Sequence, residues 1–161
     1  ALVFCGTEDG WCSFVPVIDC CTREVLGWEL ASTARAKTAE RALESALIGR
    51  FGWTRGAPEG LTIRSDNGLV FGSHLYRGIC REYNLGQEFI TPYTPEENGL
   101  AERFIRSFKE ECVWLHRFES MEQALGEIEK WIEWYNTDRP HQSLGYNTPA
   151  EAGKEHEKLA A

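Results

Sequence analysis

The sequence predicts a single α/β domain, and two observations support this. The chain has 161 residues, of which 42% are hydrophobic, which is enough for one domain with a sizeable core. Its first third reads as strands, and the remainder alternates between helical and strand patterns. Strands, a helix, a strand, a helix, a strand and then further helices is an α/β order.

The first three strands are expected over residues 2–5, 11–19 and 25–31, where β-branched and aromatic residues cluster. Residues 6–10 should form the turn between the first two strands. Pro16 lies inside the second strand, where it would remove a donor from the hydrogen-bond ladder. Its position therefore indicates a sheet edge or a bulge.

A helix and a parallel strand pair are expected next. Small and apolar residues at three-to-four spacing predict a helix through residues 36–47. A loop over residues 52–60 should lead into a strand over 61–65, a helix from about Ser73 to Tyr83, and a short strand over 87–90. A strand, a helix and a strand at this spacing indicate a parallel crossover connection.

Long helices should complete the chain, and the start of the first one has two interpretations. Thr94 before Pro95 fits an N-cap followed by a proline at the first helical position, with Glu97 as the capping-box acid. A start nearer Asn98 is the alternative, because Gly99 inside a helix would cost about 1 kcal/mol.

The second long helix should run from Met121 to about Tyr135. The apolar residues expected to face inward are Leu125, Ile128, Trp131, Ile132 and Tyr135. Trp131 and Trp134 are both candidates for core or dimer contacts, but one helix can hardly bury both on the same side. Residues 119–133 carry five acids against Lys130, so this surface should point away from any polyanion.

The charge and the cysteines limit the classes of protein to which the chain can belong. A formal net charge of −8 has the wrong sign for a chain that grips DNA through a broad basic face. Any DNA would have to be held by a local basic stripe, by metal ions, or by other parts of a longer protein. Six cysteines without a Cys-x-x-Cys pair make a zinc site a weak prediction. The charged content and the lack of a visible leader favour a cytoplasmic chain with reduced thiols. The longest apolar run, residues 14–18, is far short of a membrane span.

Asp66 and Glu102, with 35 residues between them, are the candidate catalytic pair. Asp66 ends a strand that should be parallel to its neighbour, where open α/β sheets place their ligands, and Glu102 lies on a helix. Carboxylates so placed can share hard divalent cations, which prefer oxygen ligands. Each residue also has a structural interpretation, because Asp-Asn-Gly is a turn signal and a helical Glu is usually only solvated.

The helix that carries Glu102 has two different faces. Arg106 and Lys109 follow Glu102 at four and seven residues, so the three side chains share one face. The carboxylate could hold a metal there while the cations contact phosphates. The structural alternative is an ion pair between Glu102 and Arg106 that contributes about 0.2–0.5 kcal/mol. The residues expected to face the core are Ala101, Phe104, Ile105 and Phe108.

These motifs resemble the catalytic cores of DDE transposases and retroviral integrases, and most closely the integrase-type transposases of bacterial insertion sequences. Residues 65–68 (Ser-Asp-Asn-Gly) resemble the second-acid motif of that family and residues 98–103 the third, at the family's usual spacing. Residues 136–145, followed by Thr-Pro at 148–149, look like the C-terminal signature, and residues 17–28 look like the second and third strands. The match spans about residues 1–152, which leaves a polar tail over 153–161.

The resemblance implies a ribonuclease-H-like fold with a five-stranded mixed sheet flanked by helices. It implies a core that cleaves and joins DNA strands during transposition, with two Mg²⁺ (or Mn²⁺) ions about 4 Å apart held by carboxylates that include Asp66 and Glu102. One ion would activate a water or a 3′-hydroxyl, and the other would stabilise the leaving oxygen. The partners would be double-stranded DNA, as element ends and target, and further copies of the chain in the active complex. The expected DNA contacts are Arg106, Lys109, Tyr93 and Asn98.

Several alternatives remain open. Tyr93 could stack on a DNA base or be a partly packed loop aromatic, and Arg139 and His141 could contact phosphate or the sheet edge. The family's first acid lies on strand one, and aligning that strand places it about two residues before Ala1. The chain then reads as a truncated core that is inactive alone. The competing idea is that Asp9 or Asp19 substitutes. The other functional classes are a non-catalytic module that docks DNA or pairs subunits, and a ribonuclease acting on RNA–DNA hybrids.

Overall fold

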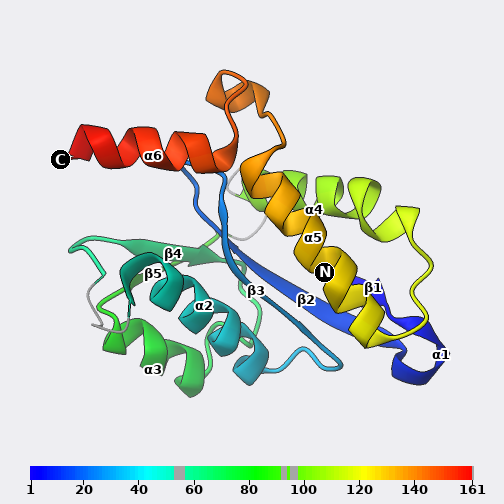
Figure 1. The fold of residues 1–161 in the computed structure, drawn as a ribbon. Helices are drawn as coiled ribbons and strands as arrows, with labels where there is room; N and C mark the ends of the chain where they lie inside the picture. The colour runs from blue at the N-terminus through cyan, green and yellow to red at the C-terminus, as the bar shows by residue number, and fades with distance from the viewer. Residues whose placement is uncertain (53–56, 92–93, 95–97, 161) are drawn as a thin grey trace.

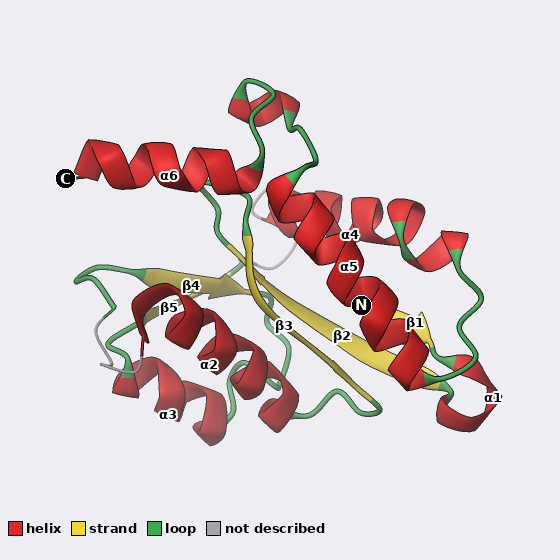
Figure 2. Ribbon diagram, viewed as in Figure 1, coloured by secondary structure: helices red, strands yellow, loops and turns green. Residues whose placement is uncertain are grey.

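Two sheets separate two groups of helices, as Figure 1 and Figure 2 show. The computed structural model describes residues 1–52, 57–91, 94 and 98–160. The strands are β1 (Leu2–Phe4), β2 (Trp11–Ile18), β3 (Val25–Ala31), β4 (Thr62–Ser65) and β5 (Gly86–Phe89). The helices are α1 (Gly6–Asp9), α2 (Ala36–Phe51), α3 (His74–Glu82), α4 (Gly99–Glu111), α5 (Met121–Thr137) and α6 (Pro149–Ala160), with 3₁₀ turns η3 (Val113–Leu115) and η4 (Gln142–Leu144). The α/β class is confirmed.

The strands form an antiparallel sheet of order β1-β2-β3 and a parallel pair, β4-β5. Thr62 lies opposite Gly86 and Ser65 opposite Phe89, so the parallel crossover through α3 is confirmed. The five expected strands are thus present in two sheets, and no ladder joins β1 to β4 among the residues that the structure describes. β1 and β4 have three and four residues, which leaves few groups for such a ladder.

Pro16 sits where its missing N–H breaks no ladder. β1 pairs with β2 only from Trp11 to Ser13, so beyond that point β2 is paired on one side alone, with Trp28 of β3 opposite Pro16. The register then shifts between Val17 and Ile18. The structure therefore contains both features that the proline indicated, an edge and a bulge.

The segment 6–10, expected as a turn, is a single turn of helix, α1. Its conformation depends on a distant part of the chain, because Asp9 Oδ2 accepts the backbone N–H of Met121 at 2.7 Å and so holds the start of α5. Gly6 has a φ of +92°, and a side chain at this position would meet the backbone of Glu119. Gly6 therefore combines left-handed backbone with a close approach that only glycine permits.

Two helices bear on the expectations for their ends. The start of α4 distinguishes between two predicted starts, and α6 occupies a segment that was expected to be a tail. α4 begins at Gly99 with Asn98 as its N-cap residue, which agrees with the later of the two predicted starts. The earlier start at Thr94 requires residues 95–97, which lie outside the described residues. Residues 153–160, expected as a polar tail, continue as α6, which extends away from the rest of the molecule in Figure 1.

A separate hydrophobic core lies on each side of the sheets. The first packs β1, β2 and β3 against α4 and α5, and Phe108 lies at its centre, fully buried and stacked on Phe14 with ring centroids 4.2 Å apart. The second packs α2 against α3, with half-buried residues of β2 and β4 beside them. Trp131 is buried at 8% exposure whereas Trp134 is 42% exposed, as the helix geometry required. No helix in the described ranges is long and apolar enough to cross a membrane.

Candidate active site

Asp66 follows β4 directly, at the carboxyl end of the parallel strand pair. Its Oδ1 atom accepts the backbone N–H of Gly68 at 2.8 Å, and Asn67 donates its side-chain amide to the carbonyl of Ile90 at 2.7 Å. The side chain of Asp66 is exposed. Asp66 therefore takes part in the turn and also stands at the strand end, with one carboxylate oxygen held by the turn. Its role as a metal ligand stays a prediction.

Glu102 lies on the first turn of α4 with its side chain exposed. The buried residues of this helix are Phe104 and Phe108, with Ala101 and Ile105 half-buried, so the predicted core-facing stripe is correct. Arg106 donates its Nε–H to Glu110 at 2.9 Å rather than pairing with Glu102. In the described part of the chain Glu102 therefore makes no ion pair, and its carboxylate is exposed to solvent.

The Ala1 ammonium makes one hydrogen bond and is affected by the charges of two candidate residues, Asp66 and Lys109. It donates to the carbonyl of Phe14 at 2.7 Å. Burial lowers the pKa of this ammonium, the Lys109 ammonium lowers it further, and the Asp66 carboxylate raises it. The charges of Lys109 and Asp66 therefore both act on the start of β1. Lys109 is half-buried and has no carboxylate partner among the described residues.

Asp9 and Asp19, the possible substitutes for a first acid, are engaged elsewhere. Asp9 accepts the N–H of Met121, as described above. Asp19 Oδ1 accepts the N–H of Cys21 at 2.7 Å, and its Oδ2 pairs with Arg50 at 3.3 Å. These bonds engage both carboxylates within the protein, and they favour structural roles for the two residues.

The donor chemistry of the site suits a hard cation, but the described donors are few. Asp66 and Glu102 offer exposed carboxylate oxygens, the ligand type that Mg²⁺ prefers. Within residues 1–52, 57–91, 94 and 98–160, no group of three or more His, Cys, Asp or Glu side chains could hold a metal ion. Tyr93 lies outside the described residues. Asn98 is half-buried and its side chain makes no cap hydrogen bond, so its amide is not used by the helix.

A pocket beside the Asp66 turn contains a residue that the sequence reasoning missed. It has a volume of about 340 Å³ and is lined by Asn67, Gly68, Leu69, Gly72, Arg77 and Phe89. Arg77 reaches it from α3. The signal that could have identified Arg77 is the charge distribution, because the fifteen residues from Asn67 to Arg81 contain no Asp or Glu.

The C-terminal signature makes contacts within the protein. Asn136 accepts the N–H of Val25 at 2.9 Å and donates to its carbonyl at 3.0 Å, which attaches α5 to β3. Arg139 forms two hydrogen bonds with Glu111, at 2.9 and 2.6 Å, which attach the end of α5 to the end of α4. His141 packs edge-on against Tyr135 with ring centroids 4.8 Å apart. The partner of Arg139 is thus on helix α4, not at the sheet edge that was one of the two expectations, and a phosphate contact by Arg139 stays a prediction.

Replacing Asn136 with Ala is expected to lower the free energy of unfolding by about 1–3 kcal/mol, because it leaves two backbone groups of Val25 without partners. Urea denaturation measures this change. The matched control is Asn147→Ala, since the Asn147 side chain makes no hydrogen bond in the described part of the chain. Equal losses for the two variants would contradict the assigned role of Asn136.

His141 should make the stability depend on pH. Burial lowers the pKa of His141 below its ordinary value, and the nearby Arg139 guanidinium lowers it further. The unfolded chain, in which a His titrates near about pH 6.5, then takes up the proton at a higher pH than the folded protein does. The contribution of His141 is therefore fully present above about pH 6.5 and is lost as the pH falls below that value.

The measurement for His141 is the free energy of unfolding at about pH 7.5 and about pH 5.5, in the wild type and in His141→Asn. The wild type should lose more stability than the variant between these two values. An identical pH dependence in both proteins would show that the His141 pKa does not change on folding.

The sequence of the chain is similar to integrase cores. Two family models, both described as integrase core domain, match residues 2–95 and 83–149. A transposase for insertion sequence element IS904 of Lactococcus lactis is 26% identical over 154 residues, which cover 95% of this chain and 59% of that protein. Transposase InsF for insertion sequence IS3A of Escherichia coli K12 is 29% identical over 149 residues, which cover 92% and 50%. The chain thus spans about half to three-fifths of these relatives.

The fold of the chain is similar to solved integrase catalytic cores, which are ribonuclease-H-like. The catalytic core domain of BIV integrase matches with a TM-score of 0.57 and 20% identity, over 92% of this chain and 88% of that one. The HTLV-2 integrase catalytic core domain in complex with magnesium matches with a TM-score of 0.60 and 15% identity, over 94% and 91%. These likenesses confirm the expected fold.

Proposed function

We propose that this chain, which belongs to the integrase core domain family, is the catalytic core of a transposase that cleaves and joins DNA strands during transposition. One observation carries the proposal: in a chain that matches integrase cores, Asp66 stands exposed at the carboxyl end of the parallel strand pair. Open α/β sheets place their reactive ligands at this end of their strands. Double-stranded DNA as substrate, further copies of the chain in the active complex and a cytoplasmic location belong to the same proposal.

In this proposal Asp66 and Glu102 hold divalent metal, as two Mg²⁺ or Mn²⁺ ions. Bound metal would supply Lewis-acid stabilisation of the charge that develops on a phosphodiester undergoing displacement. The protein orients the carboxylates: the Gly68 N–H fixes one oxygen of Asp66, and the bond from Asn67 to Ile90 anchors the turn to the end of β5. The burial of Phe104 and Phe108 fixes the rotation of α4 about its axis, so Glu102 stays on the exposed face.

The cations and the polar side chains near these acids would bind DNA. Lys109 is half-buried, has no carboxylate partner among the described residues, and is close enough to Ala1 to lower the pKa of its ammonium. Arg106 is exposed and would exchange its Glu110 partner for a phosphate. Asn98 and Tyr93 complete the proposed set of contacts. Contacts of this kind position the duplex without reading its sequence.

A third carboxylate is proposed upstream of Ala1. The support for this is the resemblance: the family's first acid lies on strand one, and aligning that strand with β1 places the acid about two residues before Ala1. Two carboxylates alone would leave most of the coordination of an octahedral ion to water and substrate. We therefore expect weak metal binding and negligible DNA cleavage by residues 1–161 alone.

The test is disintegration, the reversal of strand joining, on a branched oligonucleotide with Mn²⁺. Three proteins are compared: this chain, a version extended upstream through the expected Asp, and the extended version carrying Glu102→Gln. Activity only in the extended wild type supports the three-acid site. Inactivity in all three favours a non-catalytic module that docks DNA or pairs subunits, and equal activity with Glu102→Gln removes Glu102 from the site.

A further inference from the structure

Helix α3 exposes a row of basic side chains next to the Asp66 turn. His74, Arg77 and Arg81 occupy positions three and seven residues apart, so they share one side of the helix, and all are exposed. The opposite side holds Tyr76 and Ile79, which are buried against α2. The packing of α3 therefore forces the basic side chains outward.

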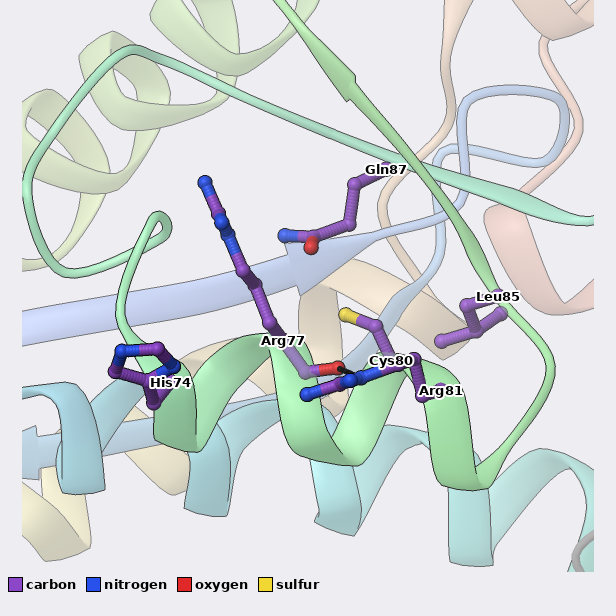
Figure 3. Close-up of a pocket in the computed structure, with 6 residues that line it drawn as sticks. All are labelled: His74, Arg77, Cys80, Arg81, Leu85 and Gln87. Carbon is purple, nitrogen blue, oxygen red and sulfur yellow. Dashed lines mark hydrogen bonds between the residues drawn. The ribbon is translucent and has the colours of Figure 1, made fainter.

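A pocket of about 370 Å³ lies along this row. Its lining residues are His74, Arg77, Cys80, Arg81, Leu85 and Gln87. Figure 3 shows Arg77 reaching outward from α3 and the Gln87 amide, from β5, pointing toward it. Gln87 also donates to the carbonyl of Phe71 at 3.1 Å, so its position is fixed. Arg77 lines this pocket and also the pocket beside the Asp66 turn, so the two pockets adjoin at its side chain.

Within the described ranges, no carboxylate neutralises the guanidinium groups of this row. In the described part of the chain neither Arg77 nor Arg81 pairs with a carboxylate, and Arg81 donates instead to the carbonyl of Arg77 at 3.4 Å. Glu88 of the neighbouring strand is itself paired with Arg64 at 3.2 Å. The stretch from Asn67 to Arg81 contains no Asp or Glu, so positive charge is concentrated there in a chain whose net charge is −8.

We propose that the two adjoining pockets bind the phosphodiester backbone of the DNA strand whose reacting phosphate lies at Asp66, with Arg77 and Arg81 as the principal phosphate ligands. This inference rests on the proposed function and adds a partner surface to it. The planar guanidinium fork matches phosphate oxygens in a bidentate manner. The row provides the local basic stripe that an acidic chain needs in order to hold a polyanion.

The experiment measures the affinity of this chain for a fluorescent DNA duplex by anisotropy, without divalent metal, over a range of salt concentrations. The variants are Arg77→Gln and Arg81→Gln. Each lost phosphate contact should lower the slope of log affinity against log salt by about 0.9, and should weaken binding about eightfold at about 0.1 M salt. Urea denaturation confirms that the variants are folded.

The matched control is Arg41→Gln on α2, which removes the same charge from an exposed arginine that faces Glu29 at 3.7 Å. Arg41→Gln should leave the salt slope unchanged and should weaken duplex binding much less than Arg77→Gln or Arg81→Gln does. Equal weakening by Arg41→Gln would mean that only net charge matters, and it would overturn the proposal. An unchanged salt slope in Arg77→Gln and Arg81→Gln, or no binding by the wild type, would also overturn it.

The proposed function can be tested independently of the phosphate-binding pockets. Asp66→Asn in the upstream-extended protein should stop strand joining without weakening the binding of the duplex, because it removes a negative charge beside the phosphates. If Asp66→Asn stops joining and Arg77→Gln leaves binding intact, the pockets are rejected and the enzyme assignment stands. If Arg77→Gln weakens binding and Asp66→Asn leaves joining intact, the DNA surface stands and the catalytic assignment is rejected.

Discussion

Replacing Asp66 with Asn is expected to lower the rate of strand joining by the upstream-extended protein at least about a thousandfold. The change removes one metal-holding carboxylate, and the stabilisation that a metal supplies to such a reaction is several kcal/mol. A loss of about 4 kcal/mol corresponds to a factor of about a thousand. Asn keeps the oxygen that accepts the Gly68 N–H, so the turn should survive. Single-turnover disintegration with Mn²⁺ measures the rate.

The control for Asp66→Asn is Asp138→Asn, which removes the same charge from an exposed carboxylate that follows α5. Its rate should stay within a factor of about two, since surface substitutions away from a site change free energies by only about 0.5 kcal/mol. A comparable loss in both variants would mean that the overall charge matters. A rate for Asp66→Asn within a few-fold of wild type would place the chemistry elsewhere.

Replacing Phe108 with Ala should lower the free energy of unfolding by about 3–5 kcal/mol. Phe108 is fully buried, stacks on Phe14 at 4.2 Å and meets the Trp131 ring edge-on at 5.4 Å. Truncation leaves a cavity between β2, α4 and α5 that these rings cannot fill. Because native domains have only about 5–15 kcal/mol in total, the variant should unfold at much lower urea concentrations.

Phe4→Ala is the matched comparison for Phe108→Ala. Phe4 has the same side chain, but it is 43% exposed and touches Trp11 in an edge-to-face contact at 5.4 Å. Its loss should cost about 0.5–1.5 kcal/mol, the value of such an aromatic pair. Equal costs for the two substitutions would contradict the placement of Phe108 at the centre of the core.

Local sequence patterns correctly predicted the elements whose burial follows from their own apolar side chains. β3 was expected over the residues it occupies, because it is an apolar and aromatic strand with a clear end at each side. The inward face of α5 was also correct, because apolar side chains at helical spacing must be buried together. Asp66 could be placed at a strand end because a turn signal follows an apolar run.

Features that depend on distant residues could not be predicted in the same way. α1 is held by the bond from the Met121 N–H to Asp9, more than a hundred residues along the chain. Arg106 pairs with Glu110 and not with Glu102. Both acids lie four residues from Arg106, so sequence spacing alone does not distinguish between them. Arg77 lies in a stretch without acids, but only the crossover geometry brings it beside the Asp66 turn.

The bond pattern of Asn136 has a consequence for how copies of this protein meet. β3 is an outer strand of its sheet, and outer strands offer unpaired backbone groups on which a foreign strand can assemble. The side-chain amide of Asn136 accepts the backbone N–H of Val25 and donates to its carbonyl. It thus replaces one pair of hydrogen bonds that a neighbouring strand would make. A single side chain thereby caps one end of this edge, and the α5 backbone that carries it shields the edge from strand-to-strand aggregation at that point.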